Sequence, residues 1–105
     1  MKHYAIVEMD VTDPAWVDDY VRNVTPMVEA AGGRYLSRSI QVDQLEGDGA
    51  APQCIVLLEW PSREIADGFY ESAEYKPFKE ARQAGAKNRF TLIPAEDVQG
   101  LAKIP

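Results

Sequence analysis

The side chains best suited to binding or polarising a small molecule gather in one stretch, from Trp60 to Tyr75. This stretch follows an unbroken apolar run, Cys54–Leu58, so a buried strand is predicted to lead directly into a helix. Aromatic rings there can line a pocket, and phenol hydroxyls can orient an oxyanion. A carboxylate such as Glu59 can act as a base if burial raises its pKa. We therefore predict that Glu59, Trp60 and Tyr75 bind a substrate. The simpler alternative is that the aromatic rings belong to the hydrophobic core and that Glu59 faces water.

Two more side chains suited to chemistry lie on other predicted strands. His3 is the only histidine, and its unperturbed pKa lies near neutrality. Arg38 lies in the middle of a predicted strand, where its guanidinium could hold a carboxylate or enolate by two hydrogen bonds. An ion pair with Glu8 or Glu59, or a contact across a dimer, would explain this charge equally well. For His3 the alternative is a partly exposed residue near the terminus.

Composition argues against several classes of function. The net charge of -6 disfavours binding to nucleic acid or to anionic membrane surfaces. The sequence has no apolar run near the roughly 20 residues of a membrane span, and we expect no signal peptide at its start. One histidine and one cysteine at distant positions do not form a metal site, so we expect no metal and no cofactor. A single cysteine, Cys54, among apolar neighbours fits a buried, inert thiol in the cytoplasm.

The first half of the chain contains the clearest elements. Residues His3–Val11 are predicted to form a strand that is apolar on both faces. A helix starts near Pro14, with Thr12 or Asp13 as its cap, and Gly32-Gly33 ends it. Its apolar stripe comprises Trp16, Val17, Tyr20, Val21, Val24, Met27, Val28 and Ala31. Alternating polar and apolar residues predict a second strand over Arg34–Leu45.

The second half repeats this order after a turn-rich connection over residues 46–52. A third strand spans Cys54–Trp60, and Ser62 caps a short helix. Ser72 is expected to be a second cap, and Pro77 to restart the helix. The last strand spans Phe90–Pro94, and an irregular tail over residues 93–105 overlaps its end. The chain is thus predicted to be one α+β domain over residues 1–105, with ferredoxin-like order β-α-β-β-α-β and a four-stranded antiparallel sheet.

The apolar pattern also predicts a partner. Two helical regions can cover only one face of a four-stranded sheet, yet the first and third strands are apolar on both faces. In so short a chain nothing is left to cover the second face. We therefore expect a homodimer with its sheets face to face, since closed symmetric dimers are the commonest oligomers.

Several short motifs carry a family resemblance. They are Gly32-Gly33-Arg34-Tyr35-Leu36-x-Arg38, Leu45-Glu46-Gly47, Glu59-Trp60-Pro61-Ser62, Phe69-Tyr70-x-Ser72-x-Glu74-Tyr75 and Arg82. By their order and spacing, the chain as far as about Pro94 resembles a small bacterial family known as domain of unknown function 1330, within the dimeric α+β barrel superfamily. The resemblance implies a ferredoxin-like fold that dimerises through its sheets. It implies no established reaction.

The wider superfamily suggests how such a fold could do chemistry. Some of its cofactor-independent cyclases are similar in having a histidine early in the first strand, near aromatic residues of the second helical region. By that resemblance His3 would pair with Tyr70 or Tyr75 as general acid and base. We expect His3, Arg38 and Tyr70 to be catalytic, in an isomerase, cyclase or monooxygenase acting on a small organic substrate in a cavity between sheet and helices. The alternative is a non-catalytic ligand-binding or interaction module in which the same residues stabilise the dimer.

The chain departs from the family pattern at two positions. Ser39 and Ile40 follow Arg38 where the family usually has glycines, and Gln53-Cys54 replaces a basic residue before the third strand. If these positions shape a pocket, the pocket of this chain is narrower and less cationic than is typical of the family.

Overall fold

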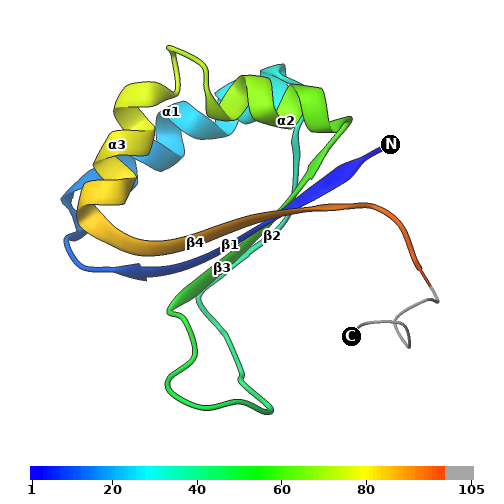
Figure 1. Ribbon diagram of the computed structural model, residues 1–105. Coiled ribbons are helices and arrows are strands. Elements are labelled where there is room, and N and C mark those ends of the chain that lie inside the picture. Colours follow the sequence, from blue (N-terminus) through cyan, green and yellow to red (C-terminus); the bar gives the residue numbers. More distant parts are fainter. Residues whose placement is uncertain (99–105) are drawn as a thin grey trace.

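The computed structural model describes residues 1–98 as a four-stranded antiparallel sheet with helices on one face (Figure 1). The elements are β1 (His3–Val11), a 3-10 turn η1 (Pro14–Trp16), α1 (Val17–Ala30), β2 (Arg34–Ser39), β3 (Cys54–Trp60), α2 (Arg63–Tyr70), α3 (Lys76–Gly85) and β4 (Ala86–Pro94). The strand order is β2-β3-β1-β4, and each neighbouring pair is antiparallel. This is the predicted α+β, ferredoxin-like arrangement, with the second helical region divided into α2 and α3.

Local signals set the ends of the helices as predicted. The Asp13 carboxylate accepts a hydrogen bond from the amide of Ala15 at 3.0 Å, and Pro14 begins the turn η1. Gly32 follows α1 with φ of 96°, a conformation that glycine adopts at little cost. In the second half, the Ser62 hydroxyl accepts from the amide of Ile65 at 3.1 Å and so caps α2.

The predicted restart of the helix is also confirmed. The Ser72 hydroxyl accepts a hydrogen bond from the amide of Tyr75 at 3.2 Å, one residue before α3 begins. Pro77 lies in the first turn of α3, where a missing amide proton costs nothing. The amides of Glu71, Ser72, Tyr75 and Lys76 find hydrogen-bond acceptors where the chain passes from α2 to α3.

The second strand is shorter than the sequence predicted. β2 ends at Ser39, which pairs with Ile55 of the antiparallel strand β3. Because β3 begins at Cys54, only one residue of β3 precedes Ile55. Residues beyond position 40 therefore have no strand opposite them, and they form a loop that extends away from the sheet (Figure 1). A register shift between Tyr35 and Ser37 also breaks the alternation on which the prediction rested.

The last strand, by contrast, is longer than predicted. β4 begins at Ala86, directly after α3, and pairs with β1 along its whole length. Residues 93 and 94, expected to belong to an irregular tail, lie in this strand, where Pro94 pairs with His3. Residues 95–98 form no helix or strand, and the rest of the predicted tail lies outside the described residues.

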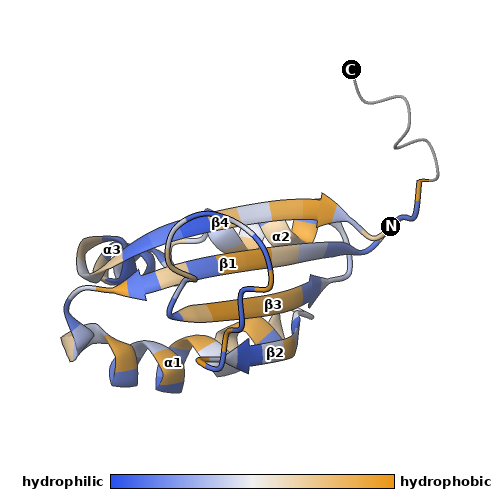
Figure 2. Ribbon diagram, turned by 90° about the horizontal axis from the view of Figure 1, so that it is seen from below, coloured by the Kyte–Doolittle hydropathy of each residue, from blue (hydrophilic) through white to orange (hydrophobic). Residues whose placement is uncertain are grey.

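The core lies between the inner face of the sheet and the helices. Ala5, Val7 and Met9 of β1 alternate inward and are buried. Ala5 packs with Val24 and Val28 of α1, which are each 1% exposed, whereas Val7 and Met9 form a second cluster with Ala86. The side chains that alternate with these inward ones along each strand form the outer face of the sheet. No helix within residues 1–98 covers this outer face, which Figure 2 shows from its own side.

Candidate functional site

A cavity of about 340 Å³ lies between the inner face of the sheet and the helices. Aliphatic and aromatic side chains form most of its wall. They include Val7, Met9, Val56 and Phe90 of the sheet and Val24 and Val28 of α1. Its rim includes two exposed apolar side chains, Val21 and Ile40. The cavity is therefore an apolar chamber that opens beside α1 and the end of β2.

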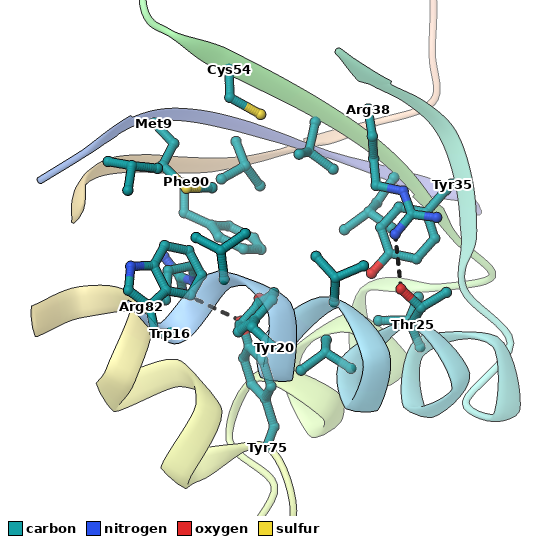
Figure 3. Close-up of a pocket in the computed structure, with 18 of the residues that line it drawn as sticks. Met9, Trp16, Tyr20, Thr25, Tyr35, Arg38, Cys54, Tyr75, Arg82 and Phe90 are labelled. Atoms are coloured by element: carbon teal, nitrogen blue, oxygen red, sulfur yellow. Dashed lines mark hydrogen bonds between the residues drawn. The ribbon is translucent and has the colours of Figure 1, made fainter. Parts of the chain in front are cut away.

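One end of the cavity holds a cluster of hydrogen-bonding groups, which we call the phenol–arginine cluster: Tyr20, Tyr75 and Arg82 (Figure 3). The hydroxyls of Tyr20 and Tyr75 are 2.6 Å apart, and either one can be the donor. Arg82 donates from Nη2 to the Tyr75 hydroxyl at 3.3 Å. Tyr20 comes from α1, Tyr75 is the residue directly before α3, and Arg82 lies within α3. The packing of α1 against α3 thus assembles the cluster.

Arg82 is a buried cation without a buried anion. It is 2% exposed, its Nε has no hydrogen-bonding partner, and it forms no ion pair within residues 1–98. Its other close neighbour is the Phe90 ring, whose centroid lies 5.5 Å from Cζ. Burial lowers the pKa of Arg82, but the phenols of Tyr75 and Tyr20 outweigh this effect and the net direction is upward. The guanidinium is therefore charged.

The phenol of Tyr20 is held in its neutral form. Burial raises its pKa far above the ordinary value, and the adjacent Tyr75 adds to the effect. At neutral pH the Tyr20 hydroxyl is therefore a hydrogen-bond donor and not a base.

This shift predicts a loss of stability at high pH. Because the folded-state pKa of Tyr20 exceeds that of the unfolded chain, about 10, its contribution is complete below pH 10 and is lost as the pH rises above it. We expect Tyr20→Phe to remove up to about 1.4 kcal/mol per pH unit from the alkaline slope of the unfolding free energy. Urea unfolding of both proteins between about pH 9 and 11.5 measures it. Equal slopes would contradict the assignment.

The other end of the cavity contains Arg38, which donates from Nη1 to the Thr25 hydroxyl of α1 at 2.8 Å. Its guanidinium stacks on the Tyr35 ring, with Cζ 3.9 Å from the centroid. The register shift after Tyr35 places both side chains on the inner face, opposite Leu58 and Val56. The alternative ion pair of Arg38 with Glu8 or Glu59 is not formed within residues 1–98. Arg38 is exposed, so water weakens its charge more than that of Arg82.

Three of the six predicted site residues line the cavity. Arg38 lies at one end, Tyr75 belongs to the phenol–arginine cluster, and Trp60 lies in the wall between sheet and helices. Trp60 and Tyr75 are each 2% exposed, so both are core residues as well as wall residues. Their predicted roles in binding remain predictions, but their position suits them.

Glu59 faces away from the cavity. It alternates with the buried Leu58 and Trp60, and its carboxylate forms an ion pair with Lys2 Nζ at 2.7 Å. This contact lowers the pKa of Glu59, whereas a general base would need a raised pKa. We predicted that Glu59 could act as a base if burial raised its pKa. In the single chain the pKa is lowered instead, so this condition is not met.

His3 and Tyr70 also lie outside the cavity. The His3 ring is 3.3 Å from the carbonyl of Met1, and His3 lines none of the three hollows found within residues 1–98. Tyr70 packs edge-on against Phe90, with ring centroids 5.2 Å apart, and it lines two shallower hollows. The expected acid–base pairing of His3 with a tyrosine is not formed in the single chain.

Sequence reasoning missed two members of the cluster. Tyr20 was predicted only as part of the apolar stripe of the first helix, and Arg82 was named among the motifs of the family resemblance. An arginine at an inward position of an amphipathic helix was the available signal, because a buried charge requires a partner. Cys54 also lines the cavity, and burial raises the pKa of its thiol, which disfavours the reactive thiolate.

Within residues 1–98, no group of three or more histidine, cysteine, aspartate or glutamate side chains is placed to hold a metal ion. No helix in this part of the chain is long and apolar enough to cross a membrane.

Comparison with known proteins places the chain in a family. The model of the family described as domain of unknown function (DUF1330) matches residues 2–95. No curated protein matches the chain. A protein of unknown function from Rhodopseudomonas palustris has a similar structure, with a TM-score of 0.77 at 16% identity over 91% of this chain and 84% of that one.

Two solved structures of named activity share the fold. SnoaB, a cofactor-independent oxygenase from Streptomyces nogalater, has a TM-score of 0.64 at 11% identity, over 93% of this chain and 96% of that one. An antibiotic biosynthesis monooxygenase has a TM-score of 0.52 at 18% identity, over 92% of this chain and 100% of that one. At these identities the likeness establishes the fold alone.

Proposed function

This chain belongs to the DUF1330 family, and on that premise we propose that it binds a small, mainly apolar organic molecule in the cavity between its sheet and helices. The cavity itself carries the proposal. Its volume of about 340 Å³ is within the ~300–1,000 Å³ typical of ligand pockets. Its apolar wall with a few polar groups at its ends is also typical of such sites. Trp60, Tyr75 and Arg38 are the predicted site residues that would contact the ligand.

We propose that any reaction in this cavity uses donated hydrogen bonds. Arg38 and Arg82 donate, and the neutral Tyr20 hydroxyl can donate, so the wall suits an oxygen that becomes negative during a reaction. No carboxylate or histidine lies among the described wall residues, so a base would come from the substrate or from a second copy of the chain. Isomerisation, cyclisation or cofactor-independent oxidation fits this arrangement, as does binding without catalysis. SnoaB supports the oxidation through its shared fold.

We also propose that two copies pair through the outer face of the sheet. Alternation along β1 and β3 places an apolar group there, in register across the strands: Tyr4, Ile6, Ile55 and Leu57, with Ile93 of β4. Glu8 lies opposite Arg89 on the same face. A self-complementary patch of this kind fits a two-fold dimer. A single cysteine, Cys54, supports the proposal that the dimer works in the reducing cytoplasm.

Filling the cavity tests the binding proposal. We expect some members of a library of small aromatic and aliphatic compounds, charged and uncharged, to raise the melting temperature of the wild-type protein. Saturation at a hundred times the Kd would add about 2.7 kcal/mol of stability. Val56→Phe places a ring in the cavity, so it should abolish these shifts.

Val42→Phe is the matched control, because Val42 lies in the loop after β2 and lines none of the three hollows. It should keep every shift. Shifts that survive in Val56→Phe would place the binding elsewhere, and no shift with any compound would refute the proposal. His3→Ala and Tyr70→Phe then test the predicted catalytic roles: a loss of turnover with unchanged binding would restore these residues to the site.

A further inference from the structure

We infer that the ligand of the cavity is an apolar monocarboxylate, whose carboxylate is bound by the phenol–arginine cluster. The inference rests on the proposed function, because it names the class of molecule that the same cavity takes. The charge, the geometry and the wall chemistry of the cluster each support it.

The first support is the unpaired charge of Arg82. Removing a guanidinium from water is expensive, and proteins normally compensate the cost with a buried carboxylate or a full set of hydrogen bonds. Arg82 has one hydrogen bond from its side chain, to the Tyr75 hydroxyl at 3.3 Å, and its Nε is without a partner. An anion that enters the cavity would supply the missing countercharge. A planar carboxylate also matches the forked donors of a guanidinium.

The second support is the direction of the hydrogen bonds in the cluster. Arg82 donates to the oxygen of Tyr75, which leaves the Tyr75 proton free to be donated to Tyr20 at 2.6 Å. In that arrangement the proton of Tyr20 points onward, to a group outside the cluster. Because Tyr20 is held neutral by burial, the chain of donors ends on a hydroxyl that can bind a carboxylate oxygen.

The third support is the charge of the wall. Asp and Glu outnumber Lys and Arg by 17 to 11 in the whole chain. Among the described residues that line the cavity the balance is reversed, with two arginines and no carboxylate. The chamber is thus cationic inside an acidic protein, so it favours an anion that carries an apolar body. Arg38 is exposed and Arg82 is the one buried cation among the described residues, which matches a single carboxylate. Uncharged molecules of the same shape would leave Arg82 unpaired.

The test compares two probes that differ in charge and little else, phenylpropanoate and phenylpropanamide. Calorimetric titration of the wild-type protein should give about ten- to a hundredfold tighter binding for the carboxylate, because hydrogen bonds to a charged group are worth about 1.5–3 kcal/mol. Equal affinity would overturn the inference and leave the proposed function intact. If neither probe nor any library compound binds, the proposed function fails with it.

Variants at position 82 locate the effect. Arg82→Met should reduce carboxylate binding to the level of the amide, with an unchanged or higher melting temperature, because it removes an unpaired buried charge. Arg22→Met is the matched control, since Arg22 is exposed on α1 and lines none of the three hollows, and it should leave both affinities unchanged. Preference for the carboxylate in folded Arg82→Met would overturn the inference. If Arg82→Met does not fold, the comparison of the two probes on the wild-type protein still decides.

Discussion

Replacing Trp60 with alanine is expected to lower the free energy of unfolding by about 3–5 kcal/mol. Trp60 is 2% exposed, and its ring packs 5.1 Å from that of Phe69. Gly33 lies so close that a β-carbon there would be 2.9 Å from the indole, so the backbone is fitted to this ring. Alanine would leave a large void in a core that has little capacity to collapse. Chemical denaturation monitored by circular dichroism measures the loss.

Trp60→Phe is the matched comparison, because it keeps an aromatic ring in the same place and should cost clearly less than the alanine variant. A cost below about 1 kcal/mol for Trp60→Ala would show that this part of the wall is not core. It would favour the view, drawn from the sequence, that Trp60 serves mainly to bind the substrate. A large cost means that the residue shapes the cavity chiefly by holding the fold together.

Introducing a charge at the centre of the outer face is expected to dissociate the proposed dimer. Ile6 lies on the central strand β1, between Leu57 of β3 and Thr91 of β4. In a two-fold dimer Ile6→Glu would bury two unpaired carboxylates, and each costs several kcal/mol. The dissociation constant should rise by at least about a hundredfold. Sedimentation at micromolar concentration should give twice the chain mass of 11.7 kDa for the wild type, and the single mass for the variant.

Ile65→Glu provides the control, because Ile65 is an apolar residue of α2 that is 39% exposed on the helical side. It carries the same change of charge and should remain dimeric. A wild-type protein that sediments as a monomer would contradict the pairing. So would dissociation caused by Ile65→Glu and not by Ile6→Glu.

The fold was predictable because each element is marked by local chemistry. Apolar patterns with periods of 3.6 and 2 residues located the helices and strands. Asp13 and Ser62 begin helical segments through side-chain hydrogen bonds that span three residues or fewer. Gly32 ends α1 because glycine adopts its positive φ at little cost. The second strand was overestimated because alternation does not show where the facing strand begins: β3 starts at Cys54, so residues beyond position 40 have no strand opposite them. The register shift after Tyr35, which places Tyr35 and Arg38 on the same face, could not be read from alternation either.

The candidate site was less predictable, because its chemistry depends on which helices meet. Tyr20 and Arg82 are 62 positions apart in the sequence and come together only when α1 packs beside α3. Glu59 and Trp60 were grouped in one predicted site because they are neighbours in the sequence. Successive residues of a strand point to opposite faces of the sheet, so only Trp60 faces the cavity. His3 and Tyr70 were grouped by resemblance, and the single chain places neither at the cavity.

The most direct test of the account is to see where a ligand binds. Methyl signals in nuclear magnetic resonance spectra distinguish the two faces of the sheet, since Val24, Val28 and Val56 line the cavity, whereas Ile6 and Ile55 belong to the outer face. During titration with phenylpropanoate, we predict saturable shifts of the three valine signals and unchanged isoleucine signals. Shifts confined to the isoleucines, or the absence of any saturable shift, would contradict the account.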